Sequence, residues 1–367
     1  MMDLVSRLVF VDTSAYEQKN YQFGEHALGR LQELVEGEKI TLLITDVTKS
    51  EIQSHLKKLS QDAAAKLKKI QKEAMFLRNT PDLPCYGIFT KQSSDSIYEI
   101  VNDKFLELIE GDCVEEISIG TVDPKIVFAN YFDKKAPFSN DAKKYEFPDA
   151  FALEAIRNIA DARQQKIYII SSDSDMKSYA DSFENLIYLS SIDEIIDSVI
   201  RHDVDLAEPA KFADSNFITL QDEILERVQS YLEGSEFYSD VIDNWEDEIV
   251  EVNITEIEIE HKSLLDVTTD EAKYEVVFKC NLTVEYSIAD YDRSPWDSED
   301  KAYAFVLQNS IIKEHVEKYS AYVDISFENA LKVNCHLEDI DFIDARFELL
   351  EQNASISSYK ELDINGD

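Results

Sequence analysis

The sequence predicts a three-layer α/β/α domain built on a parallel sheet, followed by a smaller antiparallel β-rich domain of α+β type. Three observations predict this fold class. Four short apolar runs have the look of buried strands, helical patterns lie between them, and the pattern changes to strict alternation after residue 200. The four apolar runs are Leu8–Val11, Thr41–Ile44, Ile167–Ile170 and Leu186–Leu189.

The helical patterns of the first domain have apolar residues at helical spacing. They cover His26–Glu36, Lys49–Leu77, Ala150–Arg163 and Asp193–Ile200. Residues 79–140 interrupt the alternation of strands and helices with prolines and glycines. We expect an insertion of mixed loop and helix there, containing one helix near Ser94–Ile109.

The second half of the chain begins with an amphipathic pattern over Phe217–Leu232, which predicts a linker helix. Beyond it, apolar and acidic residues alternate from Val250 to Leu337, which indicates a sheet with one core face and one wet face. The apolar parity changes between Ile254 and Ile257, so a bulge or turn is expected. The predicted boundaries are 1–202, a linker region 203–247, a β-rich domain 248–352 and a loose tail 353–367.

Charge is distributed unevenly along the chain, whose net charge is −39. Residues 1–200 hold 23 basic and 34 acidic side chains, a net of −11, whereas residues 201–367 hold 13 and 41, a net of −28. Binding to phosphates requires Lys and Arg, so the second half alone is a poor nucleic-acid binder. Seven basic residues between Lys57 and Arg78 are the local exception.

Composition also excludes several classes of protein. No run approaches the roughly 20 apolar residues that span a bilayer, and the N-terminus lacks a secretory pattern. The four cysteines form no CxxC pair, which argues against a zinc site or a disulfide framework. We therefore expect free thiols in the reducing cytoplasm.

Five carboxylates lie at predicted strand ends and helix starts. Asp12 ends the first strand, Glu51 follows the second, Asp149 opens a helix, and Asp173 and Asp175 follow the third strand. Strand carboxyl ends of an open parallel sheet meet at one crevice, where like charges raise one another's pKa. A divalent cation relieves this repulsion, and ligation by oxygen alone favours Mg²⁺ or Mn²⁺ over zinc.

Each of these carboxylates also has a simpler interpretation. Asp12 and Asp149 each suit a helix N-cap, and Thr48 and Glu51 have the spacing of a capping box. Asp173 and Asp175 fit a solvated turn. The order of all five along the chain favours one shared site over five separate explanations.

That order resembles the PIN-like nuclease superfamily over roughly residues 5–200. The matching motifs are Val11-Asp12-Thr13-Ser14, Val47-Thr48 leading to Glu51-Ile52, and Ser171-Ser172-Asp173-Ser174-Asp175. The stretch from Ala136 to Ala150 is similar to a bacterial branch of mostly uncharacterised members. Met176 stands where the family usually has an aromatic residue, and the 79–140 insertion departs from compact members.

The resemblance implies a catalytic set and a cofactor. Asp12, Glu51, Asp149 and Asp173 would be metal ligands for Mg²⁺ or Mn²⁺, with Asp175 a second candidate at the fourth position. Thr13 or Ser172 would add a hydroxyl for the water or the phosphate.

Substrate contacts are predicted at Lys66, Lys69 and Lys144, because basic side chains near the crevice neutralise backbone phosphates. A solvated helix face is the alternative for the lysines of the Lys57–Arg78 segment.

The resulting hypothesis is an endonuclease that hydrolyses single-stranded RNA with Mg²⁺ or Mn²⁺. RNA is preferred over DNA because the family leans that way. The acidic second domain would regulate the first or bind a basic protein partner, and a homo-oligomer stays open. Two alternatives are a PIN-fold scaffold or sensor that does not cut, and a toxin or phage-defence effector that uses the same chemistry.

Overall fold

The structure is a computed structural model of the 367-residue chain. It describes residues 4–138, 146–203, 206–242, 244, 246–268, 270–297, 301–327, 335–344 and 346–361, with side chains up to residue 358. The chain divides into two compact units, residues 1–202 and 203–367, and each is described by itself. No helix among the described residues is long and apolar enough to cross a membrane.

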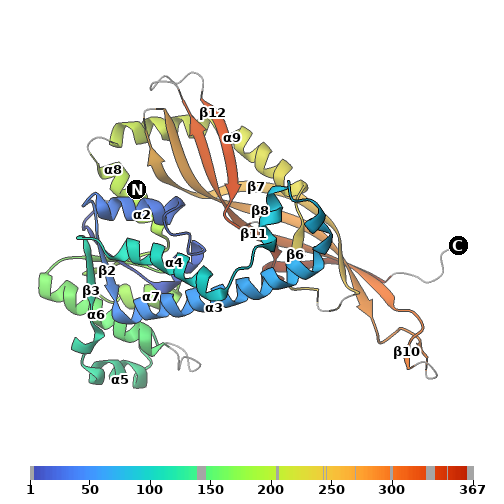
Figure 1. Cartoon of the computed structure of the whole chain (residues 1–367), viewed down its shortest axis with the longest axis horizontal. Helices are drawn as coiled ribbons and strands as arrows, with labels where there is room; N and C mark the ends of the chain where they lie inside the picture. The colour runs from blue at the N-terminus through green and yellow to red at the C-terminus, as the bar shows by residue number, and fades with distance from the viewer. Residues whose placement is uncertain are drawn as a thin grey trace. The chain divides into compact units, whose positions relative to one another are not determined.

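The first unit is built on a five-stranded sheet in which every pairing is parallel, as the sequence predicts. Its strands are β1 (Leu8–Val11), β2 (Thr41–Thr45), β3 (Val114–Ile117), β4 (Ile167–Ile170) and β5 (Leu186–Leu189). The strand order is β3-β2-β1-β4-β5 (Figure 1). From β1 the chain adds β2 and β3 on one side of the sheet, and then β4 and β5 on the other side of β1. Open parallel sheets bind ligands at such a switch point.

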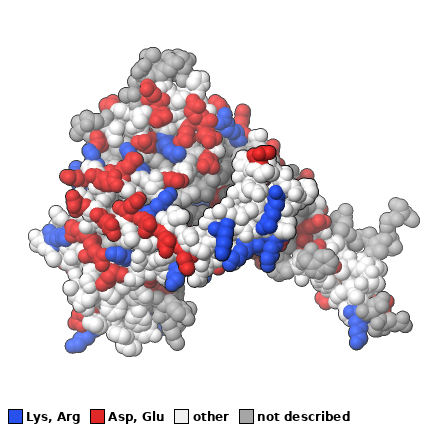
Figure 2. Space-filling model, in the orientation of Figure 1, with Lys and Arg blue, Asp and Glu red and all other residues white. Residues whose placement is uncertain are grey.

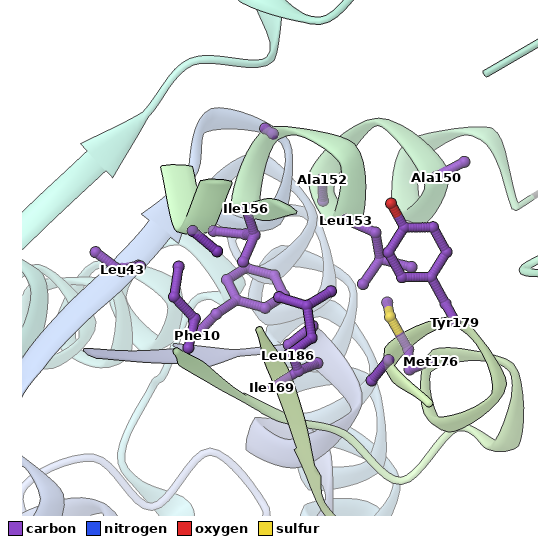
Figure 3. Close-up of a cluster of buried hydrophobic side chains, with 14 of the residues drawn as sticks. Phe10, Leu43, Ala150, Ala152, Leu153, Ile156, Ile169, Met176, Tyr179 and Leu186 are labelled. Atoms are coloured by element: carbon purple, nitrogen blue, oxygen red, sulfur yellow. The ribbon is translucent and has the colours of Figure 1, made fainter. Parts of the chain in front are cut away.

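Both faces of this sheet are covered. Phe10, Leu43 and Ile169 point to one face and pack with Leu153 and Ile156 of α6 (Phe147–Arg163) in a buried cluster (Figure 3). Residues of the other parity point to the opposite face and are also buried, namely Val9, Val11, Leu42, Ile44, Tyr168 and Ile170. Burial on both faces explains why the strands read as continuous apolar runs.

The other helices described in the first unit are α1 (Thr13–Gln18), α2 (His26–Glu36), α3 (Asp46–Glu73), α4 (Ser94–Ile109), α5 (Pro124–Phe132), α7 (Ser174–Ala180) and α8 (Ile192–His202). Of these, α2, α3, α4 and α8 fall close to the predicted ranges, whereas α1, α5 and α7 were not predicted. Three short 3-10 turns are η1 (Met75–Asn79), η2 (Pro84–Phe89) and η3 (Ile119–Thr121). Met176, which replaces the usual aromatic residue, is buried in the core.

The insertion predicted over residues 79–140 is more ordered than a mixture of loop and one helix. It contains α4 at the predicted position, but also the edge strand β3 and the helix α5. Strand β3 pairs with β2 along its whole length. The sequence conceals it because two of its four residues, Glu115 and Glu116, are charged and partly exposed at the sheet edge.

The second unit is an antiparallel β-rich domain, as predicted. Its main sheet has the order β12-β11-β8-β7, and β14 also pairs with β11. The strands are β6 (Phe237–Ser239), β7 (Glu248–Val267), β8 (Glu271–Asp290), β9 (Trp296–Asp297), β10 (Ala302–Tyr303), β11 (Leu307–Ser326), β12 (His336–Phe342), β13 (Phe347–Leu349) and β14 (Ala354–Glu361). A register shift between Ile254 and Glu256 confirms the predicted bulge.

Two segments of the second unit differ from their predicted roles. The region 203–247 contains α9 (Ala207–Glu233), whose buried face includes Phe217 and Ile224 and packs against β7 and β12. It therefore contributes to the core of this unit instead of only linking two domains. The predicted tail from residue 353 is a strand from Ala354 to Glu361, because it pairs with the edge of β11. Residues 331 and 333, assigned to a strand by alternation, lie outside the described residues.

Candidate metal centre

Asp12 follows β1 directly and is held by neighbours from two strand ends. Its Oδ2 accepts hydrogen bonds from the Ser14 amide at 3.1 Å, the Ser14 hydroxyl at 2.6 Å and the Ser171 hydroxyl at 3.0 Å. The side chain caps α1, so the simple interpretation of Asp12 holds. All three bonds go to one oxygen, and no described donor bonds to Oδ1. Capping and cation binding are therefore compatible in this residue.

The end of β4 is fixed to the end of β1 by serine hydroxyls. The Ser14 and Ser171 hydroxyls lie 3.1 Å apart, and the Ser172 amide donates to Ser14 Oγ at 3.1 Å. The Asp173 amide donates to Ser171 Oγ at 3.0 Å, and Asp173 Oδ1 accepts from the Asp175 amide at 2.8 Å. This network places Asp12 and Asp173 at the switch point of the sheet.

Glu51 comes from the second turn of α3. The N-cap of this helix is Thr45, whose hydroxyl accepts from the Thr48 amide at 3.0 Å, so Thr48 and Glu51 do not form a capping box. Instead Glu51 Oε2 accepts from the Thr13 hydroxyl at 3.1 Å. Burial and the nearby Asp12 charge raise the pKa of Glu51, against the opposing effects of Thr13 and His55.

Asp149 lies in the first turn of α6, where the helix N-terminus favours a negative charge. Even so, burial, the charges of Asp12 and Glu51 and its contact with Glu146 raise the pKa of Asp149 to about 8. Carboxylate oxygens of Glu146, Asp149 and Asp173 lie within 4.8 Å of one another. A group of three such oxygens at this separation has the spacing needed to ligate one cation.

His55 lies one turn after Glu51 on the same helix and is exposed. Its Nδ1 is hydrogen bonded to the Tyr21 hydroxyl at 3.0 Å. Tyr21 and the preceding Asn20 both have positive φ, 53° and 52°, which non-glycine residues rarely adopt. The loop therefore presents Tyr21 in a strained conformation beside the acidic site.

The structure brings together most of the residues that the sequence predicts for the site. Within the described parts of the chain, the group with ligand spacing contains the predicted Asp149 and Asp173 but not Asp12, Glu51 or Asp175. Asp12 and Glu51 are near enough to raise the pKa of Asp149, whereas Asp175 is buried in the first turn of α7.

The predicted substrate contacts are placed less uniformly. The Thr13 hydroxyl donates a hydrogen bond to Glu51, and Ser172 is exposed just after the end of β4. Lys66 and Lys69 are exposed on α3. Lys144 lies outside the described residues.

Three residues of the site were not singled out from the sequence. Glu146 precedes Asp149 by three residues, a spacing that places both on one side of a helix start. Ser14 and Ser171 sit beside predicted carboxylates, and their role is visible only once β1 and β4 are paired. The Glu146 signal was therefore available in the sequence, whereas the serine network depended on sheet order.

The donor set fits a hard divalent cation. Every candidate ligand is a carboxylate oxygen, and none is a histidine or a cysteine. Burial, followed by the charges of Asp12 and Glu51, raises the pKa of Asp149, and no cationic side chain is among the groups that shift it. A cation at this place would remove the repulsion, so the residues present fit Mg²⁺ or Mn²⁺.

Residues 9–176 match the model of a protein family described as PIN domain. The match spans the four acidic positions Asp12, Glu51, Asp149 and Asp173 and ends within α7. No curated protein and no solved structure matches the chain significantly.

Proposed function

We propose that residues 9–176, which match the PIN domain family model, form a metal-dependent endonuclease that hydrolyses single-stranded RNA. PIN domains are typically nucleases. The observation that carries the proposal is the group of carboxylates around Asp149, whose pKa is raised to about 8 by burial and by the charges of Asp12 and Glu51. A carboxylate with a purely structural role would gain no stability from a position that raises its pKa.

The cation would be held by Glu146, Asp149 and Asp173, with Asp12 and Glu51 on the same crevice as further ligands or as acceptors for its water. When bound, Mg²⁺ or Mn²⁺ supplies charge neutralisation for the phosphodiester and a lowered pKa for water. Asp175 would have a supporting role, because its backbone amide donates a hydrogen bond to Asp173 Oδ1.

The chain's own residues would perform orientation. Ser14 and Ser171 hold Asp12 so that one oxygen faces away from the hydrogen-bond network. Thr13 holds Glu51 in the same manner, and its bond favours the charged carboxylate. Such fixed acceptors place a water molecule relative to the scissile phosphate without reorganisation during the reaction. Ser172, which is exposed just after β4, would contact the phosphate.

The substrate would reach the site along α3. Lys66 and Lys69 are proposed to neutralise phosphates, and Lys144 would do so from the other side. RNA is proposed over DNA because of the family. The acidic second unit would regulate the nuclease or bind a basic partner in the cytoplasm, where its free cysteines persist.

The test is cleavage of labelled single-stranded RNA and DNA in Mn²⁺ by the intact chain and by Asp149→Asn. We expect the intact chain to cut RNA faster than DNA, and Asp149→Asn to lose at least about 100-fold, a loss of the size seen when one stabilising group is removed. Asp103→Asn, an exposed carboxylate on α4, serves as the matched control and should keep full activity.

Two other results would change the proposal. If neither protein cuts and calorimetry detects no Mn²⁺ binding, the scaffold interpretation replaces it. If expression arrests growth and Asp149→Asn relieves the arrest, the chemistry stands and the role becomes that of a toxin or defence effector.

A further inference from the structure

The outer half of α3 and the turns after it form the basic surface of this acidic chain. Between residues 57 and 91 there are eight basic and three acidic side chains, in a chain of net charge −39. The basic residues up to Arg78 are exposed, and Figure 2 shows Lys and Arg gathered over this part of the first unit. Among the described residues, the ion pair on this helix surface is Lys69 with Glu73, at 3.8 Å. The remaining charges are not neutralised by described carboxylates.

The geometry of the helix connects this surface to the candidate metal centre. With 3.6 residues per turn, Lys58 is about two turns from Glu51 and Lys69 is five turns from it, so all three lie on one face. At about 1.5 Å per residue, Lys69 lies roughly 27 Å along the axis from Glu51. Lys57 is rotated by about 120° from this face, although it is adjacent in sequence to Lys58.

Exposed aromatic rings lie in the 3-10 turns that follow the end of α3. Phe76 in η1 is 80% exposed and Tyr86 in η2 is 38% exposed. The Arg78 guanidinium lies over the Phe89 ring, 5.2 Å from its centroid. A large aromatic ring held at the surface beside cations is costly in water, and it is the combination on which unpaired bases stack.

We propose that the face of α3 bearing Glu51, Lys58 and Lys69 binds one continuous single strand of nucleic acid, and that Phe76 stacks with a base at its far end. The nucleic acid would extend along α3 from the cleavage site in one direction. Glu51 and the end of α3 are about 33 Å apart, which corresponds to roughly ten nucleotides for a strand that keeps the stacked rise of about 3.4 Å per nucleotide. The position of the cut rests on the proposed function, whereas binding of the strand is measurable without cleavage.

A single strand fits this surface better than an acidic protein does. Its phosphates repeat along a line, so one strand can contact both Lys58 and Lys69, and its bases supply rings for Phe76. A folded acidic protein would instead use the exposed apolar side chains Leu59 and Ile70, which are rotated by about 80–100° from the Glu51 face. The two partners therefore predict effects at different residues.

The experiment measures strand binding by fluorescence anisotropy in the full chain carrying Asp149→Asn, with Mn²⁺ and fixed ionic strength. Labelled single strands of roughly 5, 10 and 20 nucleotides are compared. We expect affinity to rise at least about 10-fold between roughly 5 and 10 nucleotides and to change little beyond. Adding Lys69→Glu or Phe76→Ala should remove most of this rise, and adding Lys57→Glu should change it less than about 2-fold. All three are exposed, so unchanged thermal midpoints serve as the folding control.

Several results would overturn the inference. These are equal affinity for all three lengths, a length effect that survives both Lys69→Glu and Phe76→Ala, an equal loss in Lys57→Glu, and displacement of the strand by poly-glutamate of matched charge. Loss of strand binding on Leu59→Ser but not on Phe76→Ala would also overturn the inference, because the strand would then contact the apolar residues that are rotated away from the Glu51 face. If the intact chain cuts RNA without any length effect, the inference fails and the proposed function stands. If it cuts nothing but the length effect follows the variants, the proposed function fails and the binding surface stands.

Discussion

Each of the two units contains carboxylates that are at least partly buried, but the hydrogen-bond donors around these carboxylates differ. In the first unit, Asp12, Glu51, Asp149 and Asp173 gather at the switch point of a parallel sheet. In the second unit, Glu317 is 3% exposed in the middle of β11. The difference between these regions lies in the donors around each carboxylate.

Glu317 is surrounded by hydrogen-bond donors. His315 Nδ1 lies 3.2 Å from Oε1, the Leu350 amide donates to the same oxygen at 2.8 Å, and Asn353 donates to Oε2 at 2.7 Å. His315 is itself buried, with its Nε2 2.9 Å from the Tyr286 hydroxyl. Burial alone would raise the pKa of Glu317, but these bonds hold it below its usual value.

Asp149 lacks a comparable set of donors. Among the described residues its side chain has only the acidic neighbour Glu146 as a hydrogen-bond partner, and its pKa is raised to about 8. A buried carboxylate with its donors in place is part of a finished core, whereas carboxylates packed against one another require a cation from outside. We infer that the first region is built for binding and the second for stability.

The largest expected effect follows from removing a charge in the first region. Glu51→Gln keeps the shape and the acceptor for Thr13 but loses the carboxylate, so cleavage should fall about 100- to 1,000-fold. Stability should not fall, because the substitution relieves repulsion with Asp12 and Asp149. Single-turnover cleavage and thermal unfolding of the same preparation measure both. A variant that is destabilised yet cuts normally would reverse the assignment of this region to binding.

The sequence predicts the first region well because its signals are local. Asp12 and Asp173 each follow a continuous apolar run, and such runs are recognisable when a strand is buried on both faces. The edge strand β3 was not predicted, because Glu115 and Glu116 interrupt its apolar pattern. The N-terminal turn of α6 was predicted only in part, and Glu146 was missed with it.

The second region was harder to predict for a physical reason. Strand β11 continues from Leu307 to Ser326, yet the buried positions Lys313, His315 and Glu317 are polar. A strand cannot be predicted from alternating apolar residues where the side chains on its buried face are charged. Such side chains are stabilised by hydrogen-bond partners that come together only in the folded sheet. Two of the partners of Glu317 are Leu350 and Asn353, which lie on either side of the predicted boundary between the β-rich domain and the tail.

A smaller effect, about 2 kcal/mol, is expected from the matching change in the second region. Glu317→Gln retains volume but turns a charged acceptor into an amide, and the donors of His315, Leu350 and Asn353 cannot all be satisfied. The thermal midpoint of the second unit should fall by roughly 4–8 °C. Cleavage at a temperature where the variant is folded should be unchanged.

The control for this change is Glu314→Gln. Glu314 is exposed on the same strand and accepts one hydrogen bond from Ser357, so its loss should cost less than about 0.5 kcal/mol. Equal losses from the two substitutions would remove the distinction between a satisfied buried charge and an ordinary surface charge.

The last prediction is a pH dependence of stability that has opposite signs in the two units, measured by calorimetry in a chelator. The pKa of Asp149 is raised in the folded state, so the stability linked to it is present below its unfolded pKa and is lost as pH rises toward 8. The pKa of Glu317 is lowered, so its contribution is present above its unfolded pKa and is lost on acidification.

Raising the pH from about 5 to 8 without metal should therefore weaken the first unit and leave the second unchanged, whereas lowering it below about 4 should weaken the second. Asp149→Asn should flatten the first dependence, and so should saturating Mn²⁺, because a bound cation keeps the carboxylate charged at no cost. If unfolding of the first unit does not depend on pH in chelator, the pKa of Asp149 is not raised in the folded state. The contrast between an open carboxylate cluster and a satisfied buried glutamate would then be lost.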